Sequence, residues 1–179
     1  MIGGAPPAGS LGAMPLGRAM ETTDERLVAA PPASMFDVAR DVESWPAHLA
    51  HYRFVRIRER SRAGFAVVEM SAYRQFGPIG WPTWWLSLME IVPGRPAIRF
   101  RHIEGITKEM DVEWSFEQAA GGTRVRIVHA WDGPRWPVIG VPAARLVIGP
   151  VFIHGIASRT LAGLARVAER DAAGRVEHG

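Results

Sequence analysis

The sequence predicts one α+β domain, in which a curved sheet of seven antiparallel strands is wrapped around a long C-terminal helix, with two short helices after the first strand. Three observations support this class. Most of the chain falls into short segments with apolar residues at every second position. Two short segments near the N-terminus have helical spacing instead. The run 150–170 is amphipathic and would form a rod of roughly 30 Å.

Composition narrows the class of protein. The 179 residues suffice for one domain with a core, and 47% hydrophobic with 22% charged residues is an ordinary soluble composition. The net charge of +3 is small and the arginines are scattered, so we expect no nucleic-acid partner. No apolar stretch is long enough to span a bilayer, so we expect no stable membrane insertion. We expect a cytoplasmic location, with which the absence of cysteine is compatible. The absence of cysteine excludes disulfides, thiolate zinc sites and a cysteine nucleophile.

The two ends of the chain are expected to lie outside the folded unit. Residues 1–20 are rich in Gly, Pro and Ala, which predicts a disordered tail. The ligand-binding domain is expected to cover residues 21–172, followed by a C-terminal tail at 173–179.

The first strand is expected at 21–29 and is stopped by Pro31 and Pro32. Helical spacing then predicts a short helix at 33–42 and a second at 44–52, with Ser44 as its N-cap. After these the period changes to two, and Gly- and Pro-rich segments such as 76–82 read as loops. The six further strands are expected at 52–60, 65–73, 83–92, 97–104, 107–118 and 123–131.

Alternation sorts the strand residues into two faces. One face of the last strand ends in His129 and Trp131. In the strand before it, the inward residues are Met110, Val112, Trp114 and Phe116. The outward set is expected to contain Arg99, Arg101, Asp111, Glu113 and Ser115. The strand 83–92 fits either orientation.

The inward set contains three histidines, His102, His129 and His154. His154 lies one heptad before Leu161, so it shares the apolar face of the last helix. A single inward histidine is more often a core residue, but three directed at one space indicate a lined cavity. No His-x-His or His-x3-His spacing supports a metal, and no nucleotide-binding or nucleophile-elbow motif is present, so we expect neither metal nor organic cofactor.

This order of elements resembles the START-like, helix-grip (SRPBCC) superfamily, and within it the polyketide cyclase/dehydrase (aromatase/cyclase) branch. The resemblance covers about residues 21–170. Its marks are the opening TTDERLVAAPPASMFDVARDVESWP, the Trp114-x-Phe116 strand followed by GGTRVRIVH, and the final helix. The resemblance implies a deep apolar cavity between sheet and helix that binds a hydrophobic ligand.

Family positions are matched by Trp45, Tyr52, Trp85 and Ser87. Two residues beyond that serine, where the family pattern has a cavity arginine, this chain has Met89. The departure means that the aromatase mechanism does not transfer directly.

The enzyme hypothesis is a cofactor-independent polyketide cyclase or dehydratase that promotes aldol-type ring closure or loss of water. His129 or His154 would act as base or acid and Tyr52 would polarise a carbonyl. The expected substrate-binding residues are Trp45, Trp85, Ser87, Met89, Phe100, His102, Trp114 and Trp131. An acyl carrier protein is a candidate donor of the substrate.

Two alternatives remain open from the sequence. The same cavity would suit a non-catalytic carrier of an isoprenoid, quinone or fatty acyl chain, which Met89 favours and the histidines disfavour. A protein-interaction module would instead expose apolar residues on the segment 76–82 and have little internal volume. Fold alone does not decide among the three.

Overall fold

The computed structural model describes residues 10–61, 64–76, 79–133 and 154–176. Within these ranges the chain forms seven strands, three α-helices and one 3-10 helix. The elements are β1 (Met20–Val28), α1 (Pro32–Arg40), η1 (Val42–Ser44), α2 (Trp45–His48), β2 (Tyr52–Arg60), β3 (Phe65–Phe76), β4 (Ile79–Ile91), β5 (Ala97–Gly105), β6 (Asp111–Ala119), β7 (Gly122–Trp131) and α4 (His154–Val176).

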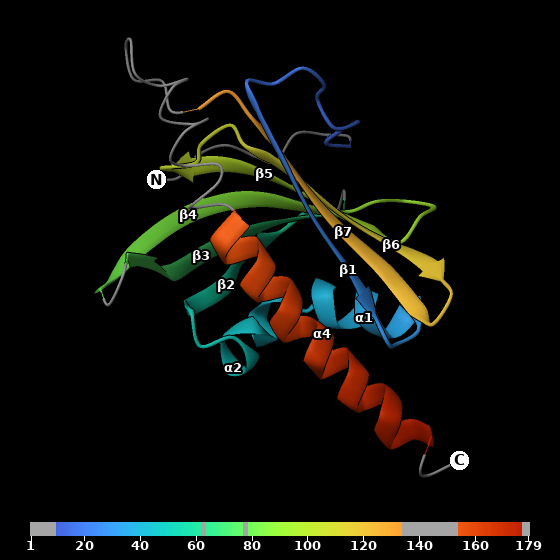
Figure 1. The fold of residues 1–179 in the computed structure, drawn as a ribbon. Coiled ribbons are helices and arrows are strands. Elements are labelled where there is room, and N and C mark those ends of the chain that lie inside the picture. Colours follow the sequence, from blue (N-terminus) through green and yellow to red (C-terminus); the bar gives the residue numbers. More distant parts are fainter. Residues whose placement is uncertain (1–9, 62–63, 77–78, 134–153, 177–179) are drawn as a thin grey trace.

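The seven strands form one antiparallel sheet in the order β1-β7-β6-β5-β4-β3-β2. Strands β2 to β7 follow one another as a meander, and β1 returns to pair with β7 from Met20↔Trp131 to Val28↔Thr123. Figure 1 shows α4 lying across one face of the curved sheet, beside the short helices. We call this the inner face and the opposite one the outer face. The predicted fold class is confirmed.

The inner face is apolar because apolar residues occupy every second position of the strands. This face packs against the apolar side of α4. Trp114 pairs with Ile127 across β6 and β7, and Phe116 pairs with Val125. These four side chains are buried in the main core together with Leu161 and Leu164 of α4. Burying each large apolar side chain contributes roughly 1.5–3 kcal/mol relative to leaving it exposed.

The two short helices begin close to where the sequence places them, but the second is shorter than predicted. α1 starts at Pro32, a position that suits proline because the first helical N–H needs no partner. α2 ends at His48, and β2 begins at Tyr52. Ser44 does not cap α2, because its hydroxyl donates to the carbonyl of Asp41.

The segment 76–82, predicted as a loop, is mostly strand. β3 and β4 stay paired to Phe76↔Ile79 and form a long hairpin. The pairing of β4 with β5 begins only at Trp85, so Pro82 lies where β4 has β3 as its single partner strand. A proline is tolerated there because its missing N–H faces an open edge.

Strand β6 starts later than predicted, at Asp111 instead of Thr107. Residues 106–109 form a turn closed by the N–H of Lys108 donating to the carbonyl of Gly105 at 3.2 Å. Gly105 has φ +97, and an added Cβ would lie 2.5 Å from the carbonyl oxygen of Trp84. Glycine is therefore required at this close approach of β5 to β4.

The orientation of β4, which the sequence left open, is now defined. Trp85 and Met89 belong to the main core on the inner face. On the outer face the indole N–H of Trp84 donates to Glu69 at 2.8 Å. Leu88 also faces outward, where it packs in a second small apolar cluster with Leu11 and Phe65.

The outer face carries a buried ion-pair cluster that the sequence analysis placed in solvent. Arg99 is 0% exposed and Asp111 1% exposed. Asp111 accepts from Arg99 at 3.2 Å and from Arg101 at 2.9 Å. The prediction of a solvated outer row is wrong for Arg99 and Asp111, because the N-terminal segment covers them.

The N-terminal residues that cover this ion-pair cluster lie within the segment 1–20, the expected disordered tail. Leu11 is buried, and its N–H donates to the Glu90 carboxylate at 2.8 Å. The carbonyl of Gly12 accepts from Arg99, and that of Leu11 accepts from Arg101 at 3.4 Å. At the other end, α4 continues to Val176, beyond the expected start of the C-terminal tail. In the described part of the chain, no helix has the length and apolar character needed to cross a membrane.

Candidate active site

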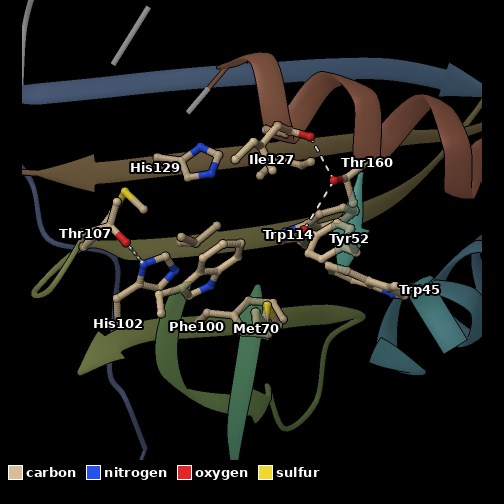
Figure 2. Close-up of a pocket in the computed structure, with 15 residues that line it drawn as sticks. Trp45, Tyr52, Met70, Phe100, His102, Thr107, Trp114, Ile127, His129 and Thr160 are labelled. Atoms are coloured by element: carbon tan, nitrogen blue, oxygen red, sulfur yellow. Dashed lines mark hydrogen bonds between the residues drawn. The ribbon is translucent and has the colours of Figure 1, made fainter. Parts of the chain in front are cut away.

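A cavity of about 70 Å³ lies between the inner face and α4. Figure 2 shows the side chains that line it. They come from α2, from every strand between β2 and β7, from the turn after β5 and from α4. The lining residues are Trp45, Tyr52, Met70, Trp85, Phe100, His102, Thr107, Met110, Val112, Trp114, Ile127, His129, Ile156, Ala157 and Thr160.

Two histidines form one end of the cavity (Figure 2). His102 on β5 contacts the hydroxyl of Thr107 through Nδ1 at 2.6 Å. His129 on β7 contacts the hydroxyl of Thr22 on β1 through Nδ1 at 3.2 Å. Each ring is therefore oriented by a threonine hydroxyl from a neighbouring segment.

Burial determines the charge state of His102. Loss of hydration, with the nearby His129 as a smaller cause, lowers the pKa of His102 from its usual 6.5 to about 3. The imidazole is therefore neutral at neutral pH. A base with so low a pKa is weak, so His102 suits hydrogen bonding better than proton abstraction.

The opposite end of the cavity carries Tyr52 and Thr160 (Figure 2). The two hydroxyl oxygens lie 3.4 Å apart, and both side chains are buried. Burial raises the pKa of Tyr52 to about 12, while the hydrogen bond with Thr160 acts in the opposite direction. The phenol stays protonated at neutral pH and is available as a hydrogen-bond donor.

Aromatic rings connect the two ends. Trp45 packs edge-on against Tyr52 with ring centroids 5.5 Å apart, and it contacts Trp114 at 5.6 Å. Trp85 lies 6.3 Å from Tyr52 and stacks on His102 at 6.0 Å with an interplanar angle of 21°. The walls are flat and apolar, so they suit a planar or cyclic hydrophobic molecule.

The arrangement offers neutral acid–base groups in a largely apolar space. Among the described residues that line the cavity there is no aspartate, glutamate, lysine or arginine. In the described ranges, no three His, Asp or Glu side chains lie close enough together to hold a metal ion. The chemistry that these groups can perform is hydrogen bonding and proton transfer by imidazole and phenol.

The size of the cavity limits what enters without movement. About 10–15 Å³ of such space holds one water, so 70 Å³ corresponds to a few waters or a small fragment. Pockets for drug-sized ligands are roughly 300–1,000 Å³. A ligand with several rings therefore requires the lining side chains or α4 to move outward.

The structure brings seven of the eleven predicted site residues to this cavity. They are Trp45, Tyr52, Trp85, Phe100, His102, Trp114 and His129. Three predicted residues are buried but do not line it. Met89 packs in the core, Ser87 has no hydrogen-bond partner for its hydroxyl within the described part, and the indole N–H of Trp131 donates to the carbonyl of Lys108 at 2.8 Å. His154 is the first residue of α4, and its side chain lies outside the described residues.

Sequence reasoning missed three polar residues, Thr160, Thr107 and His51. Thr160 had a usable signal, because it lies at helical spacing from Ala157 and Leu164 on the buried side of α4. Thr107 was assigned to a strand and not to the turn that brings it to His102. His51 was assigned to the second short helix, which ends earlier, and nothing in its local pattern indicates the contact between its Nε2 and Thr160 at 3.0 Å.

Known proteins share both the sequence pattern and the fold. The model of the family described as polyketide cyclase/dehydrase and lipid transport matches residues 28–150. The Zhui aromatase/cyclase from Streptomyces sp. R1128 superposes with a TM-score of 0.71 at 21% identity, covering 84% of this chain and 94% of that one. The protein TTHA0849 from Thermus thermophilus gives 0.70 at 22% identity, with 86% and 99% covered.

A START superfamily protein from Mycobacterium smegmatis also superposes, with a TM-score of 0.61 at 16% identity and coverage of 86% and 97%. At these identities the solved structures show a shared fold, whereas the family model covers more than half of the chain. The chain therefore has the START-like helix-grip fold and belongs to the polyketide cyclase/dehydrase and lipid transport family.

Proposed function

We propose that this protein binds a hydrophobic ketone-bearing molecule, of the polyketide class, and promotes aldol-type ring closure or loss of water without a cofactor. The observation that carries the proposal is the placement of imidazoles and a protonated phenol at opposite ends of one aromatic cavity. Such a pair can take a proton from one atom of a substrate and give a proton to another. Family membership supports the same class of reaction.

In the proposed dehydration, the carbon–hydrogen bond next to the ketone breaks and His129 takes the proton. The electron pair forms the carbon–carbon double bond as the β-hydroxyl group leaves. Tyr52 gives its proton to that hydroxyl, so that water is released. We assign the base to His129 because the low pKa of His102, about 3, makes His102 a poor base. His102 then orients the ketone by hydrogen bonding, and His154 stays an alternative base.

The test uses a bicyclic β-hydroxy ketone, a hydroxytetralone, that yields naphthol on loss of one water. Naphthol formation is followed by absorbance with the purified full chain. Tyr52→Phe and His129→Gln are each expected to lower kcat by roughly 10²–10⁴-fold. The matched controls are Tyr73→Phe and His48→Gln, which alter exposed residues of the same types and should keep wild-type turnover.

Normal turnover in both Tyr52→Phe and His129→Gln would remove these residues from the mechanism. Adding His154→Gln to the set decides between the two candidate bases. A further assay compares two forms of a polyketide substrate, the free chain and its thioester with an acyl carrier protein. A higher rate with the thioester would support the predicted carrier protein as the donor.

A second candidate is a carrier that holds a lipophilic molecule without converting it. The mostly apolar lining favours it, as does Met89 at the position where the family pattern has an arginine. Native mass spectrometry of protein purified gently from its own cells distinguishes the two. A retained isoprenoid, quinone or lipid would support carriage. A polyketide-mass ligand, or one differing by one water from a pathway intermediate, would support catalysis.

A further inference from the structure

Tyr52 is part of a hydrogen-bonded chain that extends away from the cavity. Its phenol oxygen lies 3.4 Å from Oγ1 of Thr160, and the same Oγ1 lies 3.0 Å from Nε2 of His51. The His51 ring also packs on the Tyr52 ring with centroids 4.8 Å apart. Tyr52 and Thr160 are buried, whereas His51 is only half-buried. This series of hydrogen-bonded side chains thus runs from the cavity toward the surface.

The hydroxyl of Thr160 is the shared link, and it has one proton for three neighbours. Besides Tyr52 and His51, it contacts the carbonyl of Ile156, one helical turn earlier, at 2.8 Å (Figure 2). When Thr160 donates to Ile156, its lone pairs can accept from both the phenol and the imidazole. When it rotates to donate to Tyr52, the phenol proton is free to point into the cavity. The same contacts therefore permit two proton arrangements.

We propose that His51 and Thr160 form a proton relay that connects the phenol of Tyr52 with solvent and restores its proton after each turnover. The inference rests on the proposed function in one respect, namely that Tyr52 donates a proton to the bound molecule. His51 and Thr160 act through Tyr52 and are positioning residues. Neither was among the residues predicted from the sequence.

The relay conserves protons at each step. Tyr52 gives its proton to the ligand oxygen and becomes a phenolate. Thr160 passes its hydroxyl proton to the phenolate oxygen and takes the Nε2 proton of His51 in exchange. As it gives up the Nε2 proton, His51 takes one proton from solvent on Nδ1 and stays neutral. The resulting Nδ1–H tautomer then returns to the Nε2–H tautomer by proton exchange with solvent before the next turnover. The net change is one proton transferred from solvent to ligand.

The charges around the relay keep His51 in the form that this exchange needs. Burial first, and then the positive charge of Arg159 on α4, lower the pKa of His51 to about 4. Around Tyr52 the packed rings are Trp45 and Trp85, which carry no charge. A neutral imidazole has one protonated and one unprotonated nitrogen, so it can receive a proton on one side and release one on the other.

The direct test measures how fast the phenolic proton of Tyr52 exchanges with water. The chain has two tyrosines, so in a Tyr73→Phe background the ¹³Cζ resonance of labelled tyrosine reports Tyr52 alone. In a mixture of H₂O and D₂O, slow exchange gives separate signals for the O–H and O–D forms, and fast exchange gives one averaged signal. We expect fast exchange in the otherwise wild-type chain.

Thr160→Val keeps the shape of the side chain and removes the hydroxyl, and His51→Phe keeps an aromatic ring next to Tyr52. Each is expected to slow the exchange by about tenfold or more. Thr160→Ser restores the hydroxyl and should restore fast exchange, and His48→Phe is the matched control at an exposed histidine. Unchanged exchange in both Thr160→Val and His51→Phe, with folding verified by amide spectra, would overturn the relay.

Turnover of the hydroxytetralone separates this inference from the proposed function. If both hold, Thr160→Val lowers kcat with little change in KM, and Thr160→Ser recovers it. Another outcome is that Tyr52→Phe abolishes turnover while Thr160→Val and His51→Phe keep wild-type rates of phenolic proton exchange and of substrate turnover. In that case the proposed function stands and the relay fails. If exchange slows in the relay variants but Tyr52→Phe keeps full turnover, the relay stands and the catalytic role of Tyr52 fails.

Discussion

The two faces of the sheet both bury polar side chains, but they do so in different ways. On the outer face Arg99, Arg101 and Asp111 are charged and paired, and the backbone of residues 11–12 covers them. On the inner face the buried polar groups of His102 and Tyr52 are neutral and adjoin an open volume. Burial of charges within ion pairs indicates a structural role, whereas burial beside free space indicates a site. The contrast predicts different costs of mutation.

The largest effect is expected on the outer face. Asp111→Ala leaves the fully buried Arg99 without its closest carboxylate, and removing one partner of a buried pair costs about 3–5 kcal/mol. Urea denaturation measures the change. The control Arg124→Ala breaks an exposed pair with Glu25 and should cost under about 0.5 kcal/mol. Equal losses in the two variants would show that burial of the outer pair is unimportant.

A charge placed on the inner face sharpens the comparison. Met89→Arg introduces the residue type of the family pattern at a core position between Ala66 and Phe100. These cross-strand neighbours offer the cation no carboxylate, so we expect a loss of roughly 2–4 kcal/mol. Met89→Leu, which conserves volume, should cost less than about 1.5 kcal/mol. Wild-type stability for Met89→Arg would mean that the inner face accommodates a cation.

Acid should weaken the inner face through His102. In the unfolded chain this histidine binds a proton near pH 6.5, but in the folded chain its pKa is about 3. Stability is therefore unaffected above pH 6.5 and falls as the pH drops from 6.5 toward 3, by up to about 1.4 kcal/mol per pH unit. His102→Asn should flatten this part of the profile. Parallel wild-type and variant curves would assign the acid sensitivity to other groups.

The smallest effect on stability is expected at Tyr52. Tyr52→Phe removes a hydroxyl whose protein contact is the long one to Thr160, so the free energy of unfolding should change by less than about 1.5 kcal/mol. Thermal unfolding followed by circular dichroism measures it. A loss as large as that of Asp111→Ala would mean that the phenol holds the fold together, and would weaken its assignment to a site.

The sequence predicted well what depends on local periodicity. Alternation within one strand placed Trp114 and His129 on the inner face, and helical spacing placed Leu161 and Leu164 on the buried side of α4. These inferences need only the geometry of the element that contains the residue. For the same reason the seven strands were predicted from the sequence, whereas the pairing of β1 with β7 was not.

What failed depends on contacts between segments far apart in the chain. Arg99 and Asp111 alternate outward as predicted, yet they are buried because residues 11–12 return to cover them. Trp131 lies on the predicted strand but donates to Lys108 and does not line the cavity. Thr160 and His51 meet across more than a hundred residues. No local sequence pattern predicts contacts between residues so far apart in the chain.

The pairing of β1 with β7 has a consequence for synthesis of the chain. β2 to β7 can pair with their neighbours as they leave the ribosome, because their connections are short. β1 is made first but must wait for a partner about 100 residues later. During translation its backbone is an unpaired edge, and Glu21, Asp24, Glu25 and Arg26 supply the charges that discourage aggregation of such edges. The charged residues of β1 thus discourage aggregation of the nascent chain until β7 has been made.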